Sequence, residues 1–269
     1  MSAIPPIGAG QLALALVFVL LAGAANLWLK LGLGRDLLVG TVRTFAQLFL
    51  MGYVLVYVFR VEQAWLVLAM FAGMIFFAAR IVAGRVKNKG PRVFNPVFLS
   101  MLGSYMVVTF LVVAVVVQAQ PWWEARYFLP LGGMVVGNSM NAMALSLERL
   151  FSEVKNRRLE LEMLLSLGAD PREASAGAVA DSVAAGMIPT INSMMGVGVV
   201  FLPGMMTGQI LAGADPLVSI KYQIVVMLML VGSTTLASLL AVHLARRRLF
   251  NPAGQLAWPP LGVPKSPGA

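Results

Sequence analysis

Several amide side chains lie inside the apolar stretches of this sequence, together with methionine thioethers. An amide in hydrocarbon needs a hydrogen-bonding partner, so it either joins helices or lines a polar path. Thioethers are soft ligands for some transition metals, and amide oxygens also accept ferrous iron; the alternative is that methionine fills gaps in a core. We predict a path without assigning individual metal ligands. Its members are Asn138, Asn141, Asn192, Met205, Met206 and Gln209.

Several kinds of catalytic chemistry lack their residues. There is no cysteine, which excludes thiolate metal sites and thiol nucleophiles. The single histidine, His243, has no companion ligand at zinc spacing, and no G-x-x-x-x-G-K-[ST] phosphate loop is present. A dyad of Ser139 with His243 is disfavoured because Met140 replaces the closing glycine of a nucleophile elbow. We expect a protein that is not an enzyme and that binds no cofactor itself.

The composition indicates an integral membrane protein. Of the 269 residues, 59% are hydrophobic and 12% are charged, about half the charge of a soluble domain. A span needs about 20 apolar helical residues, and continuous rather than alternating runs favour helices over barrel strands. We predict an all-α fold with seven spans. The runs are Leu12–Leu29, Val39–Phe59, Ala64–Ala83, Val97–Val117, Phe128–Leu147, Gly186–Ala212 and Ile224–Ala245.

The basic residues predict the orientation of these spans. All but three of the 20 Lys and Arg fall in alternate connections and the C-terminal region, the exceptions being Arg60, Arg126 and Lys221. This bias puts the N-terminus outside and the C-terminus in the cytoplasm. The net charge of +9 is thereby explained by topology and membrane lipid, without nucleic acid. We expect a multi-pass protein of the inner (plasma) membrane.

Arg43 is a charged residue within an apolar stretch. Arg43 and Gln47 are four residues apart, hence on one helical face. Either Arg43 faces the protein interior or it snorkels to the cytoplasmic surface.

The only long polar connection, residues 148–173, predicts a cytoplasmic element. Glu160 to Leu164 suit an amphipathic helix at the membrane surface. Gly168 offers a helix C-cap, and Asp170 followed by Pro171 offers the start of another helix. The pattern resembles the loop by which ABC importer permeases dock onto their ATPase subunits. The coupling residues that we predict are Glu162, Leu165, Gly168, Ala169, Asp170 and Pro171.

The segment after this loop must bend. As one helix with a rise of ~1.5 Å per residue, residues 170–202 would be about 50 Å long, which exceeds the ~30 Å hydrocarbon core. We predict a broken sixth helix with hinges at Pro189, Pro203 and Gly204. Glycines four residues apart permit close helix packing; those predicted to do so are Gly133, Gly137 and Gly208.

Several motifs in order resemble those of the FetB-type iron-export permease family, which includes the membrane subunits of plant aluminium-tolerance ABC transporters. The match covers roughly residues 10–250. The motifs are Val135–Ala142, Ser166–Ala169, Ile188–Ser193, Leu202–Gly208, Ala212–Pro216, Ile220–Ile224, Arg43-x3-Gln47 and Gly52–Leu55.

The resemblance implies a half-size permease that works with a separate ATP-binding subunit, with two copies of each. ATP and Mg would bind that partner, and the exported solute would be a metal ion such as iron or a related solute. Residues 1–250 would form one transmembrane domain, and 251–269 a disordered tail.

The resemblance departs at one place. Relatives carry arginines around the coupling segment, whereas Ala180 and Ala184 flank residues 181–183 here, so we expect Asp181 to lack a partner. Two other functions stay open. An ion-coupled secondary transporter is favoured by the broken helix and would need no ATPase, and a structural or sensor subunit would bind partners without moving solute.

Overall fold

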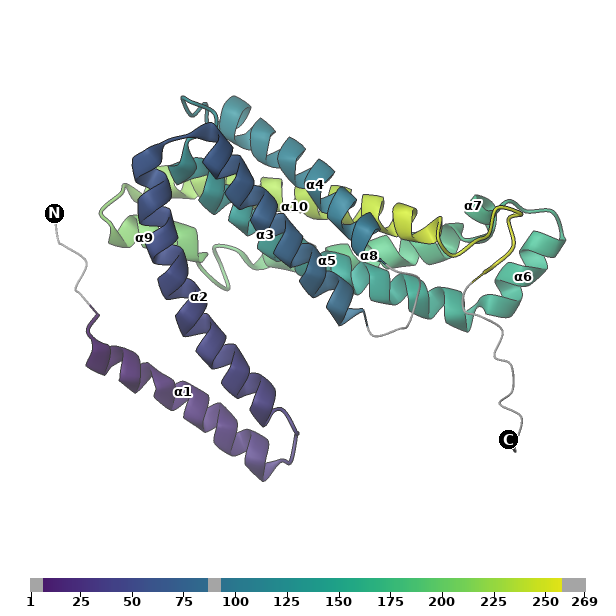
Figure 1. Cartoon of the computed structure of the whole chain (residues 1–269), viewed down its shortest axis with the longest axis horizontal. Coiled ribbons are helices and arrows are strands. Elements are labelled where there is room, and N and C mark those ends of the chain that lie inside the picture. The colour runs from purple at the N-terminus through teal and green to yellow at the C-terminus, as the bar shows by residue number, and fades with distance from the viewer. Residues whose placement is uncertain (1–6, 87–92, 258–269) are drawn as a thin grey trace.

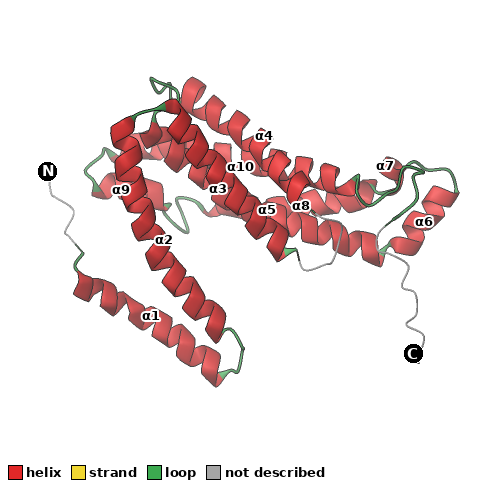
Figure 2. Cartoon of the chain, viewed as in Figure 1, coloured by secondary structure: helices red, strands yellow, loops and turns green. Residues whose placement is uncertain are grey.

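The computed structural model describes residues 7–86 and 93–257, and this part of the chain is helical apart from short loops and two isolated β-bridges (Figures 1 and 2). The long helices lie side by side in a bundle, with α6 and α7 at one end. The elements are α1 (Ala9–Trp28), α2 (Gly34–Val61), α3 (Ala64–Arg85), α4 (Phe94–Phe110), the π-helical η1 (Leu111–Val116), α5 (Ala125–Asn156), α6 (Arg158–Ser166), α7 (Pro171–Ala174), α8 (Ala176–Gly196), α9 (Gly204–Leu211) and α10 (Pro216–Arg246).

Within the described residues, five helices are long and apolar enough to cross a membrane, rather than the seven expected: α1, α2, α3, α4 with η1, and α10. The fifth predicted run forms α5, and the sixth forms the end of α8, a loop and α9; neither α5 nor α8 is among the candidate spans. Polar side chains in these helices, such as Asn138 and Asn141 in α5, explain the difference. The all-helical membrane fold is confirmed, with α5 packed against α3 and α10, and α8 packed against α10.

The core forms around α5, which contacts α8, α10 and α3 most extensively. Phe71 of α3 is completely buried and lies against Gly132 of α5, where an added Cβ would come within 2.5 Å of its ring. The same ring packs edge-on against Phe128, with 5.2 Å between centroids. Edge-to-face geometry is favourable for aromatic pairs, so α3 and α5 are joined by shape and by ring orientation.

Hydroxyl groups and a glycine join α5 to its other neighbours. Ser139 Oγ lies 3.3 Å from Ser233 Oγ and 3.4 Å from Thr234 Oγ1 on α10, all buried. On the α8 side, a Cβ at Gly186 would overlap the Ser146 side chain and lie 2.7 Å from the carbonyl oxygen of Ala142. Ser139 is thus committed to α10, whereas His243 binds the Leu239 carbonyl with Nδ1, and no dyad forms.

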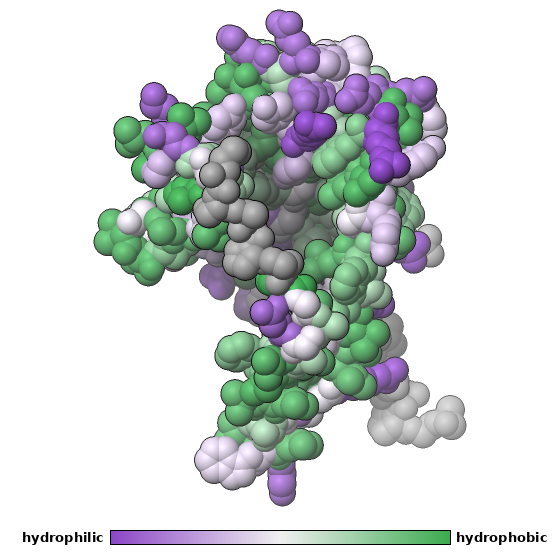
Figure 3. All heavy atoms as spheres, turned by 90° about the vertical axis from the view of Figure 1, so that its left-hand side faces the viewer, coloured by the Kyte–Doolittle hydropathy of each residue, from purple (hydrophilic) through white to green (hydrophobic). Residues whose placement is uncertain are grey.

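The hairpin of α1 and α2 stands apart from this bundle (Figure 1). Its side chains are mostly exposed and apolar, as the projecting lower part of Figure 3 shows. Asn26 is an exception: it is buried, and its Oδ1 accepts a hydrogen bond from Leu33 N at 2.8 Å, which closes the hairpin turn. Arg43 and Gln47 are both exposed, so Arg43 does not face this chain's own core.

The sixth predicted run is broken, but not at Pro189. Helix α8 continues through Pro189 and ends at Gly196; residues 197–203 form a loop, and α9 begins at Gly204. Gly198 has φ +84°, a conformation that glycine adopts without steric cost. A proline within a helix removes one backbone hydrogen bond, and here that loss does not end the helix. The interruption coincides with two of the predicted hinges, Pro203 and Gly204.

The predicted disordered tail is incorrect for its first residues. Residues 251–257 fold back on the bundle: Asn251 N donates to Gln255 O at 2.9 Å, Ala257 N donates to Leu249 O at 2.7 Å, and Leu256 packs on the core. A Cβ at Gly254 would lie 3.6 Å from Pro171. Local hydrogen bonds and contact with α7 order this segment. The rest of the predicted tail, residues 258–269, lies outside the described residues.

The predicted glycine contacts are made in part. A Cβ at Gly133 would lie 3.2 Å from Met74 of α3, whereas nothing described lies within 4 Å of one at Gly137 or Gly208. Spacing alone selected glycines on the same helix face, yet Gly132 and Gly186 make the tightest approaches. Within this chain, Gly137 and Gly208 therefore do not bring helices together.

Replacing Gly186 with Ala should destabilise the fold by about 1–3 kcal/mol, the usual cost of overpacking a dense core. The added methyl group meets both a side chain and a backbone oxygen, so small side-chain shifts cannot relieve it. Gly232→Ala on α10 is the matched control, since nothing described lies within 4 Å of its Cβ. Thermal unfolding in detergent micelles would measure both, and equal stability of the two variants would contradict the packing argument.

Candidate translocation site

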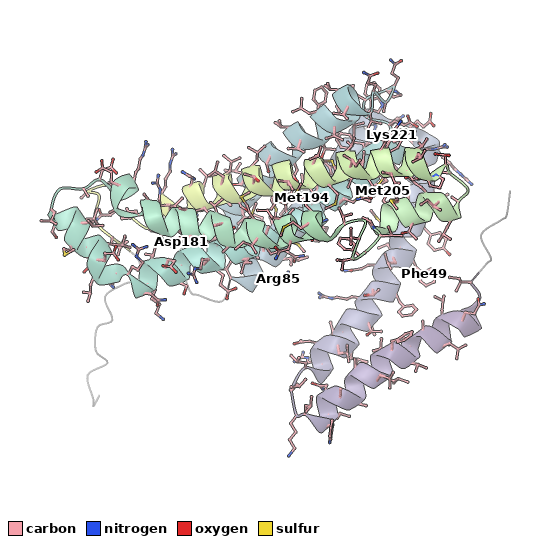
Figure 4. The ribbon with its side chains drawn as sticks, turned by 180° about the vertical axis from the view of Figure 1, so that it is seen from behind. Phe49, Arg85, Asp181, Met194, Met205 and Lys221 are labelled. Carbon is pink, nitrogen blue, oxygen red and sulfur yellow. The ribbon has the colours of Figure 1, made fainter. Side chains whose placement is uncertain are left out.

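A cavity of about 480 Å³ opens where α5, α8, α9 and α10 meet around the 197–203 loop. Figure 4 shows α8 and α9 nearly in line beside α10, with Met194 before the interruption and Met205 after it. Interrupted helices at membrane depth are tolerated where they line a cavity. The polar or sulfur-bearing residues of the wall are Met134, Asn138, Asn141, Thr190, Ser193, Met205, Gln223 and Met227.

The structure brings three of the six predicted path residues to this cavity: Asn138, Asn141 and Met205. Met206 is buried and lines an adjoining cavity of about 390 Å³. Asn192 is exposed, Gln209 is half-buried, and neither lines these two cavities. The predicted hinge residues Pro189, Pro203 and Gly204 also line the first cavity, so the helix interruption forms part of its wall.

No charged side chain is among the residues lining the two cavities, and the described residues contain no group of three His, Asp or Glu arranged to hold a metal ion. The amides supply the polarity. Asn138 Nδ2 donates to Met134 O at 3.0 Å, and Asn141 Oδ1 accepts from Arg85 at 2.6 Å. Arg85 ends α3, so one wall amide is held by a cation at that end of the span.

Gln223 was missed in the sequence, although it is the buried amide shared by both cavities. Its side chain is 6% exposed, and its Oε1 has no hydrogen-bond partner among the described residues. A buried unpaired amide oxygen costs free energy, so a solute that donates a hydrogen bond there would relieve that cost. The rule that selected Asn138, an amide within an apolar run, did not reach Gln223, because the predicted run Ile224–Ala245 begins one residue later.

Methionine thioethers line both cavities. Met134, Met205 and Met227 line the first cavity, and Met227 also lines the second together with Met194 and Met206. Thioethers and amide oxygens can bind transition metals weakly without a formal negative charge. The two cavities together offer a neutral, soft-donor environment.

The predicted caps of the coupling segment are present. Gly168 has φ +94° directly after α6. Asp170 Oδ1 accepts from Arg172 N at 2.6 Å and from Glu173 N at 2.8 Å, and Glu173 Oε2 accepts from Asp170 N at 3.1 Å. The bond from Glu173 N is the main cause that lowers the Asp170 pKa. The cap is therefore formed at neutral pH and is lost only as Asp170 protonates in acid.

The exposed apolar face of α6 was also missed. Leu159, Met163 and Leu167 are 82%, 56% and 77% exposed, and their i, i+4, i+8 spacing puts them on one side of the helix. The opposite side holds Leu161, which is 1% exposed, and Leu165, which packs against the core. Leu165 is thus half-buried on the side of α6 that faces the bundle. Glu162 accepts from Arg158 Nε at 2.8 Å and stabilises α6.

Asp181 has a cationic neighbour, contrary to expectation. Its Oδ2 lies 4.0 Å from Arg157 Nη1, and Arg157 also pairs with Glu160 at 2.6 Å. The hydrogen bond to Arg157 lowers the Glu160 pKa, so the pair is ionised at neutral pH. The guanidinium passes over Gly177, where a Cβ would lie 3.2 Å from it. Arg157 lies between α5 and α6, 24 residues before Asp181, so the sequence around Asp181 could not reveal this contact.

Comparison with known proteins gives several full-length relatives. A membrane protein of Synechocystis, slr1647, is 37% identical over 229 residues, which cover 85% of this chain and 88% of that protein. The probable iron export permease protein FetB of Escherichia coli is 36% identical over 91% of this chain and 93% of its own length. Protein ALUMINUM SENSITIVE 3 of Arabidopsis thaliana is 35% identical over 91% and 88%.

No solved structure gives a significant match to this chain. The family model described as uncharacterised protein family UPF0014 matches residues 9–250, which include all of α1 to α10. The chain therefore belongs to the UPF0014 family of membrane proteins, the family that includes FetB and the plant aluminium-sensitivity protein.

Proposed function

We propose that this chain is the membrane-spanning subunit of an ABC transporter in the inner (plasma) membrane, that it exports a metal ion such as iron, and that a separate subunit hydrolyses ATP with Mg. Two copies of each chain would form the transporter, with the N-terminus outside and the C-terminus in the cytoplasm. The printed name of the Escherichia coli relative, a probable iron export permease, supports the cargo and its direction.

The observation that carries this proposal is a series of contacts. They run from an exposed apolar face of α6, through Arg157, to α8, which lines the cavity. Leu159 and Met163 belong to α6 and Leu167 directly follows it, at the end of the bundle (Figure 1), and all three are exposed. A contiguous apolar stripe exposed to water marks an interaction site, and a short helix fits into a cleft of a soluble partner. This face would receive the ATP-binding subunit.

Arg157 connects that face to the cavity. It lies between α5 and α6, pairs with Glu160 of α6 and approaches Asp181 of α8. Helix α8 then carries Pro189, Thr190 and Ser193 into the cavity wall. A movement of α6 caused by ATP binding would therefore be passed to α8, and the loop between α8 and α9 would accommodate the shift.

An ion-coupled secondary transporter is the alternative, because a discontinuous helix with a cavity at its interruption is also typical of that class. The two functions differ in their requirement for ATP. Flux of iron in proteoliposomes that contain the permease alone would favour the alternative. Flux that appears only with the ATP-binding subunit and ATP would favour the ABC transporter.

Replacing Gln223 with Met should reduce metal-stimulated ATPase activity of the reconstituted complex by about tenfold, the value of roughly one hydrogen bond. Thermal stability should be kept or raised, because the change removes an unpaired buried oxygen at similar volume. Asn192→Ala, which is exposed and outside both cavities, is the matched control. Full metal stimulation in Gln223→Met would show that the cavity is not on the path.

Replacing Leu159 and Leu167 together with Ser should reduce binding of the ATP-binding subunit at least tenfold, because two exposed apolar anchors are lost. Folding should be unchanged, since neither side chain is in the core. Co-purification from detergent would measure binding. Leu159→Met with Leu167→Met should bind normally, and Ser166→Ala tests the neighbouring surface of α6. Normal binding by the double Ser variant would place the docking face elsewhere.

A further inference from the structure

A groove separate from these two cavities lies between α8 and α10, at the end of the bundle that holds α7. Its volume is about 720 Å³, larger than either cavity on the proposed path, and none of its residues lines those cavities. Neither the proposed transport route nor the α6 docking face uses it. It is a separate site.

One end of this groove is cationic. Arg172, Arg246 and Arg247 line it, and among the described residues none of them makes an ion pair within 4.0 Å. Arg172 and Arg247 are close enough to Arg246 to repel it, and the carboxylate that attracts it is Asp170. Asp170 already accepts two backbone hydrogen bonds as a helix cap. The residues that line the groove include three guanidinium groups and no carboxylate, so the excess positive charge favours an anion.

Apart from His243, the rest of the groove is lined by apolar side chains of α8 and α10. Ala180 and Ala184 leave space on α8, and Val183, Met187 and Leu239 form its sides. With a rise of ~1.5 Å per residue, Leu239 lies about 10 Å inside the end of α10, which is a candidate span. An apolar groove at that depth is reached by an acyl chain, whereas an acidic segment of a soluble protein would reach only the arginines.

We propose that this groove binds an anionic phospholipid, with the headgroup phosphate on Arg172, Arg246 and Arg247 and one acyl chain along Val183, Met187 and Leu239. Arginine binds phosphate oxygens with its planar donors, and basic pockets between membrane helices bind anionic headgroups. The site requires only that the chain lies in a membrane, so it is independent of the transport reaction. A bound lipid would fill the space between α7, α8 and α10, beside the element that connects the coupling segment to the cavity.

The test is native mass spectrometry of the purified full-length permease, titrated in detergent with phosphatidylglycerol or phosphatidylcholine. We expect phosphatidylglycerol to bind at least tenfold more tightly. Arg172→Gln with Arg247→Gln should abolish that preference, because the double variant removes two of the three guanidinium groups that would attract the anionic headgroup. Both arginines are exposed, so the variant should fold. Arg126→Gln, exposed in α5 at the opposite end of the bundle, is the control.

A second variant tests the apolar half. Ala184→Leu should weaken binding of both lipids by filling the groove while leaving the arginines in place. Equal affinity of the wild type for the two lipids would overturn the proposal, and so would an unchanged preference in the double Gln variant. Loss of ATP-binding-subunit binding in that variant, with phosphatidylglycerol affinity unchanged, would assign the arginines to a protein partner instead.

Discussion

Close backbone approach between α5 and α8 at Gly186 is the constraint on which the rest of this structure depends. In a membrane the lipid tails are as apolar as the side chains, so helices associate through packing and polar contacts rather than through water exclusion. A glycine at residue 186 lets α8 reach the Ala142 carbonyl and Ser146 on α5. That contact fixes α8 beside α5, and the cavity opens further along the same pair, where Pro189 and Asn141 line it.

The polar contacts of the core have a related role. Ser139 meets Ser233 and Thr234 between α5 and α10, whereas Asn141 and Gln223 line the cavity. The hydroxyls of Ser139, Ser233 and Thr234 join helices, whereas the amides of Asn138, Asn141 and Gln223 border open space together with the hydroxyls of Thr190 and Ser193. Helix α5 therefore contacts α10 through Ser139 and lines the cavity with Asn138 and Asn141.

Three features lie at the end of the bundle that holds α6 and α7. The apolar stripe of α6 suits a soluble protein, the Arg157 pair connects α6 to α8, and the arginines of the α8–α10 groove suit an anionic headgroup. Residues 251–257 cover α7 from the remaining side. Helix α8 takes part in two of these features, the approach of Arg157 to Asp181 and the groove beside α10.

The sequence by itself determined the class of molecule, because hydropathy, helical spacing and caps are local properties. It predicted the five apolar membrane helices, a turn at Gly168 after α6, the Asp170 cap and the interruption at Pro203 and Gly204, whereas the count of seven spans is not confirmed and no break occurs at Pro189. Only the tertiary structure decided which polar residues meet. Asn138 and Asn141 reach the cavity while Asn192 does not, Gln223 joins them from α10, and Arg157 approaches Asp181 across more than 20 residues. Spacing along one helix defines a face, whereas packing against other helices decides what lies next to that face. Gly186 contacts α5 closely, while no described atom lies within 4 Å of a Cβ added at Gly137.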